Sequence, residues 1–405
     1  VLEVSQKIQK NVSKDQAVLV VGAQKTASET FAQSLSSELE GKVEHQLITG
    51  TPRDLRVALD ALQREGKTLG AIATSGVPAN WPVVEGIPHK YAESKDFQLL
   101  TPQSRVWPTC LKASNLLAIV DRIVVIAVIA IGMTLVIITG GIDLSVGSLI
   151  AFSSVVAALI VVALGGEDAS AGAVFLGFLG CVFACGLVGA FTGSLVAHFA
   201  MPSFIVTLGI MMIAKGAAFT LTNGNSIEAL PDAFTWLGRE RVLGIPNTVI
   251  LLIILYIGAH LFMSKTRMGR YIYAIGGNKE AARLSGVPVR HVTTFVFVVC
   301  SIMAAIGGCI QASQINSGDP KTGVMVELEV IAAVVVGGTS LAGGSGRIFG
   351  TLIGAFIIGV IRNGMNIVNI EAYVQMIVLG SVIILAVFLD QVRRKRGLRN
   401  LIHSH

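Results

Sequence analysis

Long apolar runs fill the chain from residue 116 almost to its C-terminal end. Each run has roughly the 20 residues that an α-helix needs to cross the hydrocarbon core of a bilayer. Charged residues make up only 14% of the 405 residues, against roughly 25% in an ordinary soluble domain, and the shortage is concentrated in these runs. The sequence therefore predicts an all-α polytopic membrane domain over residues 113–390.

The turns between the runs divide this domain into nine predicted spans, at residues 116–140, 146–165, 171–199, 202–222, 247–264, 292–315, 327–344, 349–368 and 372–390. A basic cluster, RRKR at 393–396, follows the last run, so residues 391–405 are expected to form a cytoplasmic tail. Counting backwards from that tail places the basic loop 265–290 inside and the acidic pair Glu167 and Asp168 outside. This arrangement agrees with the positive-inside rule.

Residues 1–112 have a polar composition and are predicted to form a small α/β domain. Apolar runs of strand length alternate with helical stripes, which predicts strands at 17–21, 43–48 and 69–74 and helices that begin at Ser28 and Pro52. That order favours a parallel sheet in a three-layer unit. The residues from 77 to 108 are rich in Pro and aromatic side chains and are predicted to be loop.

Nine spans place this α/β domain on the extracytoplasmic side of the membrane, because the number is odd and the tail is inside. Nothing before residue 116 is apolar enough to be a leading span or a signal peptide. We therefore expect a further span that precedes this sequence. An alternative start codon at Val1 would also account for this arrangement, as would an error in one of the nine predicted spans.

The sequence contains no recognisable motif for catalysis, metal binding or nucleotide binding. The turn VVGAQKT at 20–26 lacks the first glycine of a G-x-x-x-x-G-K-[ST] phosphate loop, so a plain strand-to-helix turn is expected. The five cysteines have neither metal-ligand nor disulfide spacing and are expected to be lipid-facing or core thiols. No metal, cofactor or catalytic residue is predicted. The net charge of +6 comes largely from basic residues beside apolar runs, so no nucleic-acid partner is expected.

A polar, basic interruption at residues 273–291 separates two long apolar runs. Its first half is predicted to be a short helix with small alanine faces, which Gly286 and Pro288 terminate. Such a helix, held between two spans, suits the docking of a soluble partner, and an ordinary loop is the alternative. The residues that we expect to form the docking site are Asn278, Glu280, Ala281, Ala282, Arg283 and Gly286.

Two glycine-rich stretches share one pattern, G-G-x-x-L-x-x-G. The first begins at Gly140 and the second at Gly337, each at the predicted inner end of a span. Because those two spans run in the same direction, the pattern suggests a parallel internal repeat, which is common in transporters. The glycines would allow unwound backbone beside a watery pathway or simply close packing of helices.

Six polar residues in or beside the spans are candidates for a translocation pathway: Asp143, Ser145, Thr339, Ser340, Asn363 and Asn366. Asp143 could instead cap the helix that follows it. The two asparagines could hydrogen-bond a polyhydroxylated solute or only tie helices together. Lys215 and Arg362 lie deeper, where a charge must face a cavity, find a partner or snorkel.

Residues 112–405 resemble the membrane permease of bacterial ABC importers of the ribose and monosaccharide type. The stretches that carry the resemblance are GMTLVIITGGIDLSVGS at 132–148, AIGGNKEAARLSG at 274–286, GGTSLAGGSGR at 337–347 and NGMN at 363–366. The resemblance implies two paired permeases in the inner membrane, two cytoplasmic ABC ATPase subunits and an extracytoplasmic sugar-binding protein. It also implies that residues 280–286 are the coupling helix, which docks in a groove of the ATPase.

The chain departs from that family in two places. The family has ten spans, and the polar domain here stands where its first span would be, which an insertion between the first and second spans would explain. The family usually has a small or amide residue at the position of Arg362, so a cation here puts a neutral solute in question.

The predicted function is that of a transport subunit, not an enzyme: an inner-membrane permease for a monosaccharide such as ribose, driven by ATP hydrolysis on another chain. One alternative is an ion-coupled secondary transporter, which would need intramembrane carboxylates as ion relays. Asp143 lies near a predicted boundary, and Glu327 and Glu329 lie near the outer end of their predicted span, so few carboxylates are placed for this role. The other alternative is a membrane sensor whose extracytoplasmic domain binds a ligand.

Overall fold

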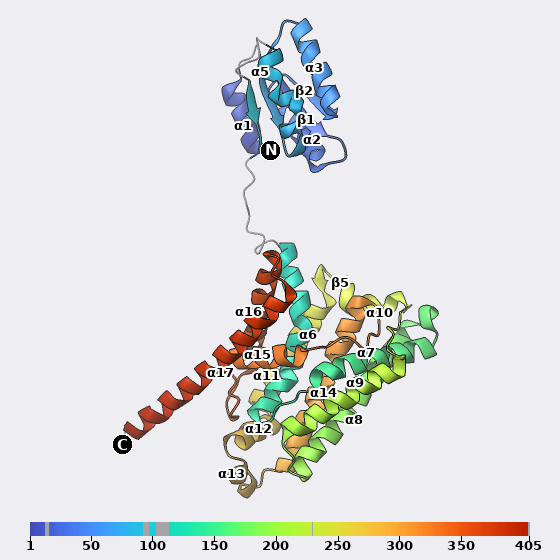
Figure 1. Cartoon of the computed structure of the whole chain (residues 1–405), viewed down its shortest axis with the longest axis vertical. Helices are drawn as coiled ribbons and strands as arrows, with labels where there is room; N and C mark the ends of the chain where they lie inside the picture. The colour runs from blue at the N-terminus through green and yellow to red at the C-terminus, as the bar shows by residue number, and fades with distance from the viewer. Residues whose placement is uncertain (13–15, 92–96, 103–112, 229, 404–405) are drawn as a thin grey trace. The chain divides into compact units, whose positions relative to one another are not determined.

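The computed structural model describes residues 1–12, 16–91, 97–102, 113–228 and 230–403 (Figure 1). The chain forms two compact units, Val1–Trp107 and Pro108–His405. The predicted boundary after residue 112 falls beside residues 103–112, which lie outside the described parts.

The N-terminal unit is built on a parallel sheet with the strand order β2-β1-β3-β4. Its elements are α1 (Leu2–Asn11), β1 (Gln16–Ala23), α2 (Ala27–Leu39), β2 (His45–Gly50), α3 (Pro52–Arg64), β3 (Thr68–Thr74), η1 (Val77–Asn80), α4 (Pro82–Glu85), α5 (Ile87–Lys90) and β4 (Gln98–Leu100).

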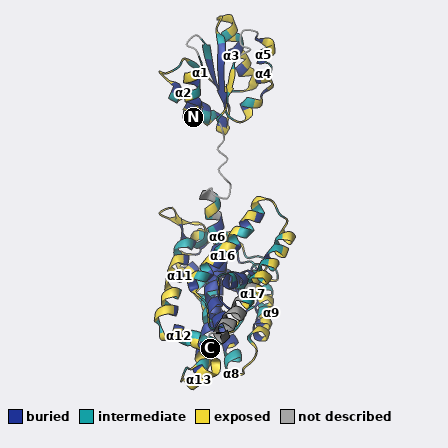
Figure 2. Cartoon of the chain, turned by 90° about the vertical axis from the view of Figure 1, so that its left-hand side faces the viewer, coloured by how far each residue is buried: buried dark blue, intermediate teal, exposed yellow. Residues whose placement is uncertain are grey.

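Helices cover both faces of this sheet. Because successive strand residues point to opposite sides, Val18 and Val20 pack against α1 and α2, whereas Leu19 and Val21 pack against α3, α4 and α5. Figure 2 shows the dark-blue buried residues concentrated in the strands. The three-layer unit with a parallel sheet is therefore as predicted.

The three predicted strands and the two predicted helices of this unit are confirmed. Thr51 caps α3, as expected from the Thr-Pro pair, and its N–H donates to the Asp54 carboxylate at 2.7 Å. The loop prediction for residues 77–108 was wrong where the structure describes them, because η1, α4, α5 and the edge strand β4 lie there; residues 92–96 and 103–108 are outside the described parts. Those elements have three or four residues each, too few for a periodic pattern to reveal them.

The C-terminal unit is helical. Its elements are α6 (Ala113–Ile138), α7 (Val146–Ala163), η4 (Gly166–Asp168), α8 (Ala171–His198), α9 (Ser203–Thr222), α10 (Asp232–Arg239), β5 (Arg241–Val242), β6 (Ile245–Pro246), α11 (Asn247–Lys265), α12 (Arg267–Gly277), α13 (Lys279–Leu284), α14 (Val289–Ile315), α15 (Val326–Val336), α16 (Ile348–Ile367) and α17 (Ala372–His403).

Seven of the helices in the described residues are long and apolar enough to cross a membrane: α6, α7, α8, α9, α11, α14 and α16. The predicted count of nine is therefore not confirmed. The expected span at 327–344 contains only the 11 residues of α15, because Gly337 and Gly338 end the helix. The expected span at 372–390 corresponds to α17, whose apolar part, Ala372–Phe388, is shorter than a full span.

The centre of the membrane unit is formed by α6 and α14, which are the most buried of the long helices together with α7. In Figure 2, α6 is dark blue, whereas α11 and α9 carry many yellow exposed residues. The outward faces of α8 and α11 are apolar, with Phe183 and Ile254 more than half exposed. These faces suit contact with lipid chains. Four cysteines are free and buried, so the core alternative for these thiols holds.

Two non-helical segments run inside the bundle. Residues 139–145 connect α6 to α7, and residues 316–325 connect α14 to α15. The second segment runs antiparallel to α7, since Gly318 lies against Ser154 and Gly323 lies against Gly147. Those two α7 positions are about 10 Å apart along the helix axis, so α15 begins well inside the bundle. This position explains why 11 residues are enough for α15 to reach the end of the unit where α12 and α13 lie.

Candidate functional site

The predicted docking site forms an exposed tip of the membrane unit. Asn278 ends α12 and caps α13, since its side-chain oxygen accepts a hydrogen bond from the N–H of Ala281 at 3.0 Å. Glu280 pairs with Arg283 at 2.8 Å across one turn of α13, and both side chains are about two-thirds exposed. Gly286 has a φ of +81°, which turns the chain away from the helix.

Within this tip, one predicted residue is buried and one unpredicted residue is strongly exposed. Ala282 is only 5% exposed and anchors α13 to the bundle, so it is not part of the free surface. Leu284 is 82% exposed, and it was not among the predicted docking residues. An apolar side chain at the end of a charged helix is a signal that could have identified it, because a partner groove would bury it.

The last turn of α12 contacts both glycine-rich stretches. A Cβ atom at Gly276 would lie 1.8 Å from the carbonyl oxygen of Ile138 and 2.4 Å from the amide nitrogen of Gly344. Gly344 in turn donates its N–H to the Ile138 carbonyl at 2.9 Å. Three backbones therefore meet here, from α12, from the end of α6 and from the turn after α15. We call this contact the Gly276 junction.

A side-chain hydrogen bond reinforces the Gly276 junction. The hydroxyl of Tyr273 donates to the carbonyl oxygen of Gly346 at 2.8 Å. Burial raises the pKa of Tyr273, although the nearby Arg347 acts in the opposite direction, so the hydroxyl stays protonated at neutral pH. The docking tip is thus fixed to the turn between α15 and α16. Neither Tyr273 nor Gly276 was predicted as a site residue, although both lie in the polar interruption at 273–291.

Asp143 is completely buried, and it holds the start of α7. Its carboxylate accepts hydrogen bonds from the N–H of Ser145 at 2.9 Å and from the Ser145 hydroxyl at 2.6 Å. One carboxylate oxygen has no hydrogen-bond partner among the described residues. The carboxylate thus orders Ser145, the residue before α7, but it bonds no N–H of the helix itself, so the capping alternative is not observed. Asp143 lies beside Cys300, near the middle of α14, so it is deeper in the bundle than a boundary position.

Thr339 and Ser340 lie together in the turn after α15 and are both buried. The N–H of Ser340 donates to the Ser345 carbonyl at 3.1 Å, and Gly346 packs against Thr339. They shape the turn that forms part of the Gly276 junction. The structure does not bring them together with the predicted asparagines of α16.

Asn363 and Asn366 lie near the opposite end of the unit. Asn363 is 8% exposed and donates to the Asn115 side chain at 3.1 Å, while Asn366 accepts a hydrogen bond from Gln375 at 2.9 Å. Both asparagines therefore tie helices together, and Asn363 also lines a cavity of about 340 Å³ between α6, α14, α15 and α16. The same cavity is lined by the amide of Gln311, which was not predicted.

Arg362 has a partner inside the membrane unit. Its guanidinium donates to the carboxylate of Glu329 at 2.7 Å, and the Glu329 side chain is only 10% exposed against 42% for Arg362. Arg362 therefore has a partner, and it also lines two cavities, so two of the three possibilities for this cation are observed. The pair carries no net charge, which removes the objection that an isolated cation raised against a neutral solute.

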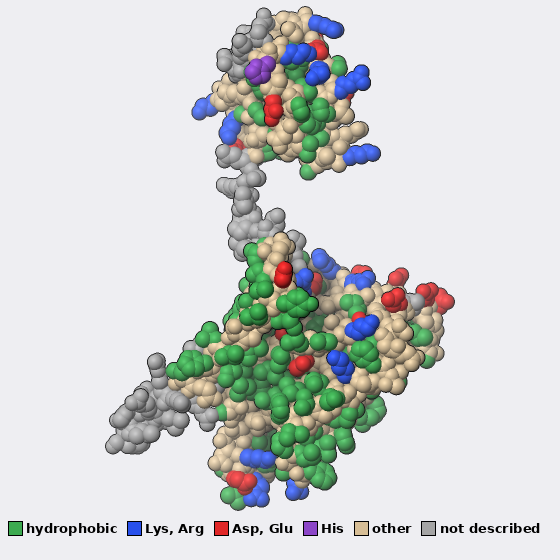
Figure 3. Space-filling view, in the orientation of Figure 1, with side chains coloured by type: hydrophobic (Ala, Val, Ile, Leu, Met, Phe, Trp, Pro, Cys, Tyr) green, Lys and Arg blue, Asp and Glu red, His purple; other side chains and the backbone are tan. Residues whose placement is uncertain are grey.

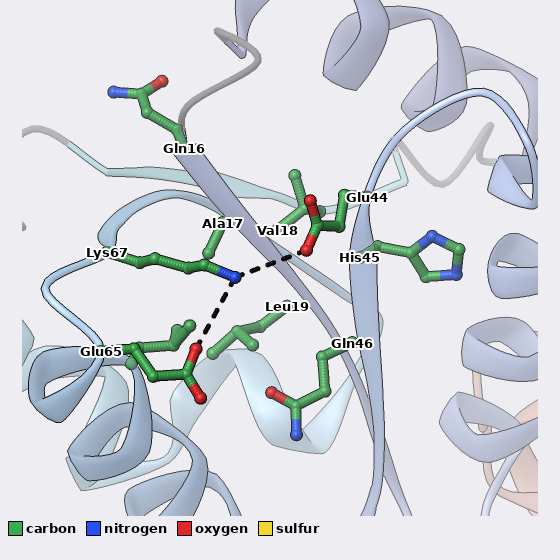
Figure 4. Close-up of a pocket in the computed structure, with 10 residues that line it drawn as sticks. Gln16, Ala17, Val18, Leu19, Glu44, His45, Gln46, Glu65 and Lys67 are labelled. Carbon is green, nitrogen blue, oxygen red and sulfur yellow. Dashed lines mark hydrogen bonds and ion pairs between the residues drawn. The ribbon is translucent and has the colours of Figure 1, made fainter.

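A separate cavity of about 380 Å³ lies in the N-terminal unit (Figure 4). Lys67 lies over it and pairs with Glu44 at 3.4 Å and with Glu65 at 3.6 Å. The cavity opens at the amino ends of β1 and β2, whereas ligands of open parallel sheets bind beyond the carboxyl ends. Both carboxylates of the cavity already have Lys67 as an ion-pair partner. Across the described residues, no three His, Cys, Asp or Glu side chains gather closely enough to hold a metal ion.

The chain matches a protein-family model described as branched-chain amino acid transport system / permease component over residues 115–387. It is 43% identical over 297 residues to the ribose import permease protein RbsC of Escherichia coli K12, covering 72% of this chain and 90% of that relative. It is 40% identical to RbsC of Bacillus subtilis, covering 70% of this chain and 87% of the relative.

A third relative is the L-arabinose ABC transporter permease protein AraH of Azospirillum brasilense. The identity is 37%, over 71% of this chain and 83% of the relative. No solved structure matches the chain significantly. The matched region coincides with the membrane unit and contains the docking tip, the Gly276 junction and the Glu329–Arg362 pair. The chain therefore belongs to the branched-chain amino acid transport system / permease component family.

Proposed function

We propose that this chain is the membrane-spanning permease subunit of an ATP-driven importer, and that it passes a monosaccharide such as ribose across the cytoplasmic membrane. The observation that carries the proposal is the Gly276 junction, which joins an exposed docking tip to both glycine-rich turns. The relatives import ribose or transport L-arabinose, which supports a sugar as the solute.

In this proposal the tip formed by α13 is the coupling helix of the importer. The residues that contact the ATPase are Asn278, Glu280, Ala281, Arg283, Leu284 and Gly286, with Ala282 as their anchor. The exposed Leu284 enters the groove of the ATPase, and the charged pair beside it sets the register. Two ATPase subunits, two copies of this chain and an extracytoplasmic sugar-binding protein make up the complex.

Transport follows from the connection between the tip and the bundle. When the ATPase subunits close on ATP, α13 moves with them, and the Gly276 junction carries that movement to the end of α6 and to the turn before α16. The bundle then alternates between access from outside and access from inside. The asparagines and Asp143 remain proposed pathway residues, although each also has a structural contact.

The proposed orientation places the docking tip and the basic tail in the cytoplasm. The N-terminal unit then lies on the extracytoplasmic side, as an insertion between the first and second spans of the family. The neutral Glu329–Arg362 pair supports an uncharged solute, because a neutral pathway neither repels nor traps a molecule without charge.

The proposal is tested by reconstituting the permease with its ATPase and sugar-binding partners in lipid vesicles. We expect ATP-dependent uptake of labelled D-ribose, L-arabinose or D-allose, and no uptake with a non-hydrolysable ATP analogue. Uptake driven by a proton gradient in the absence of ATP would contradict the ATP-driven mechanism. Failure to take up any of the sugars while ATP is hydrolysed would contradict the solute class.

A further inference from the structure

Charged side chains of the membrane unit gather around the amino end of α15. Glu327 and Glu329 lie in its first turn, Lys215 comes from α9 and Arg362 comes from α16. Lys215 is exposed on the surface of this unit, and Arg362 is 42% exposed. A charge that faces hydrocarbon costs several kcal/mol. The face that carries these groups therefore borders water or protein and not lipid, unlike the apolar outer faces of α8 and α11.

Three cavities adjoin one another around this helix end. The first, of about 340 Å³, shares Glu329 and Arg362 with a second cavity of about 270 Å³. The second shares Val324 and Met325 with a third cavity of about 170 Å³ that lies against α7 and α9. An ion pair and two apolar side chains are thus the only described groups common to adjacent cavities. Figure 3 shows acidic and basic side chains on the otherwise largely hydrophobic face of this unit.

The third cavity is bordered by backbone that is not helical. A Cβ atom at Gly147 would lie 2.1 Å from the Glu327 carboxylate, and one at Gly323 would lie 2.0 Å from the Gly147 carbonyl oxygen. Met325 adopts a φ of +64°, a conformation that is strained for a residue with a side chain. Unwound backbone at membrane depth is tolerated where it is buried in protein or lines a watery cavity, and broken helices mark the solute sites of many transporters.

The groups around the cavities provide both hydrogen-bond donors and acceptors. Lys215 and Glu327 line the third cavity together with the hydroxyls of Ser148 and Thr322. The first cavity adds the amide of Gln311. Hydroxyl groups of a sugar both donate and accept, so this set matches them. Cavities of this size hold one small solute, since pockets for drug-sized ligands begin at about 300 Å³.

We propose that the three cavities are parts of one hydrated solute passage around the amino end of α15, in which Lys215, Glu327 and the Glu329–Arg362 pair hydrogen-bond a neutral polyhydroxylated solute. The inference rests on the proposed function for the solute class, but the passage itself rests on the geometry. The Glu329–Arg362 pair and the Val324 and Met325 side chains are the groups that adjacent cavities of this passage share.

The test measures whether water reaches single cysteines in the assembled complex. Lys215→Cys and Met325→Cys are made in a chain with Cys110→Ser, and the other four cysteines are kept because they are buried. Ile213→Cys is the matched control, since Ile213 is 65% exposed on α9 but lies about 200° around the helix from Lys215. A negatively charged methanethiosulfonate reagent modifies the thiolate form of cysteine. Because the thiolate forms only in water, the reaction rate reports whether water reaches the cysteine.

We expect Lys215→Cys and Met325→Cys to react at least about tenfold faster than Ile213→Cys. A transported sugar, D-ribose or L-arabinose, is expected to slow the reaction of Lys215→Cys. Equal rates at the three positions would overturn the passage. Fast labelling that a transported sugar does not slow would overturn the sugar contact. Labelling requires no transport. A complex that imports none of these sugars would therefore refute the proposed function, while the labelling rates would still show whether the passage contains water. Retention of the ATPase on purification shows that each variant has assembled.

Discussion

At the scale of single residues, the absence of a side chain matters most at Gly276. The distance of 1.8 Å from a Cβ atom there to the Ile138 carbonyl oxygen is far below any real contact, and the other close atom is also backbone. Neither neighbour can rotate away, as the end of a flexible side chain could. The residue therefore sets how closely α12 approaches the end of α6, which is the contact that transmits movement in the proposed mechanism.

Gly276→Ala is expected to reduce ATP-driven uptake about 5- to 140-fold, because forcing backbones apart costs about 1–3 kcal/mol and each 1.4 kcal/mol is a factor of ten. The ATPase should still purify with the permease, since the exposed tip is unchanged. Gly277→Ala is the control, because nothing lies within 4 Å of a Cβ atom at that position. Equal uptake by the two variants would contradict the role of the junction.

The Glu329–Arg362 pair makes a second prediction at this scale. Arg362→Met leaves a nearly buried carboxylate unpaired and should cost about 2–3 kcal/mol, less than a fully buried pair because Arg362 is 42% exposed. Glu329→Gln with Arg362→Met should recover most of that loss. The measurement is the thermal unfolding temperature of the permease in detergent. A double variant that is no more stable than Arg362→Met alone would show that the two charges do not depend on each other.

In the N-terminal unit, the hydroxyl of Tyr91 donates to the Asp60 carboxylate at 2.5 Å. Burial, and then this bond, raise the pKa of Tyr91 to about 12, and the same bond lowers the pKa of Asp60. The Tyr91 contribution to stability is therefore complete below about pH 10 and lost between about pH 10 and 12. The Asp60 contribution is present above about pH 3.9 and lost as the pH falls through its lowered pKa.

Tyr91→Phe should reduce both the loss of stability above about pH 10 and the loss at acidic pH. The urea midpoint of the N-terminal unit, followed by Trp81 fluorescence in a full-length chain whose other two tryptophans are replaced by Phe, measures the effect. Trp81 suits the purpose because it is buried in the same apolar cluster as Tyr91. If the midpoint of the Tyr91→Phe variant fell as steeply as that of the parent above pH 10, the bond would not be the cause.

At the scale of elements, the long helices and the central strands could be predicted from sequence because each contains several periods of its pattern. The limits of α8, α9 and α11 agree with the predicted spans to within one or two residues. The 11-residue α15 could not be predicted, since its apolar residues continue without a break into the glycine turn. That α15 begins inside the bundle depends on the contact of Gly147 with Gly323, which are 176 positions apart in the chain and share no local pattern.

The candidate site was only partly predictable for the same reason. The docking tip lies within one short stretch, and its helix and terminating glycine were both recognisable in the sequence. The Glu329–Arg362 pair and the Gly276 junction join residues from different helices, so no spacing reveals them. Asn363 and Thr339 were predicted from residue type alone, and they occupy different ends of the unit.

The α13 helix also makes a prediction as an element. Leu284→Glu should abolish retention of the ATPase on purification and with it ATP-driven uptake, because a charge replaces the side chain expected to enter the apolar groove. Ser285→Ala, at the neighbouring exposed position, should leave both unchanged. Retention of the ATPase by Leu284→Glu at the level of the parent would mean that α13 does not dock through this residue.

In the molecule as a whole, the two units suit different surroundings, water for the N-terminal unit and lipid for the membrane unit, and they are stabilised in different ways. The N-terminal unit buries apolar side chains on both faces of a sheet, as a water-soluble domain does. The membrane unit exposes apolar side chains outward and keeps its charges around α15 and at its ends. This distribution agrees with a membrane permease and does not depend on the number of spans.

The proposed orientation predicts the side on which each unit is found. An epitope inserted after Gly41, in an exposed turn of the N-terminal unit, should bind antibody in intact spheroplasts. A tag after His405 should bind antibody only after the membrane is opened. Antibody binding to both tags, or to neither, in intact spheroplasts would contradict the extracytoplasmic insertion. The comparison is direct because both tags are on one chain.

The Gly276 junction has a consequence for how related permeases can be recombined. Its closest contacts join backbone to backbone, so a relative that keeps Gly276 and Tyr273 can supply them whatever its other side chains are. A chimeric permease that takes α12 and α13 from a relative should therefore keep its transmission intact while acquiring the ATPase preference of the donor. Exchange of this one segment would therefore change which ATPase powers the transport of a given solute.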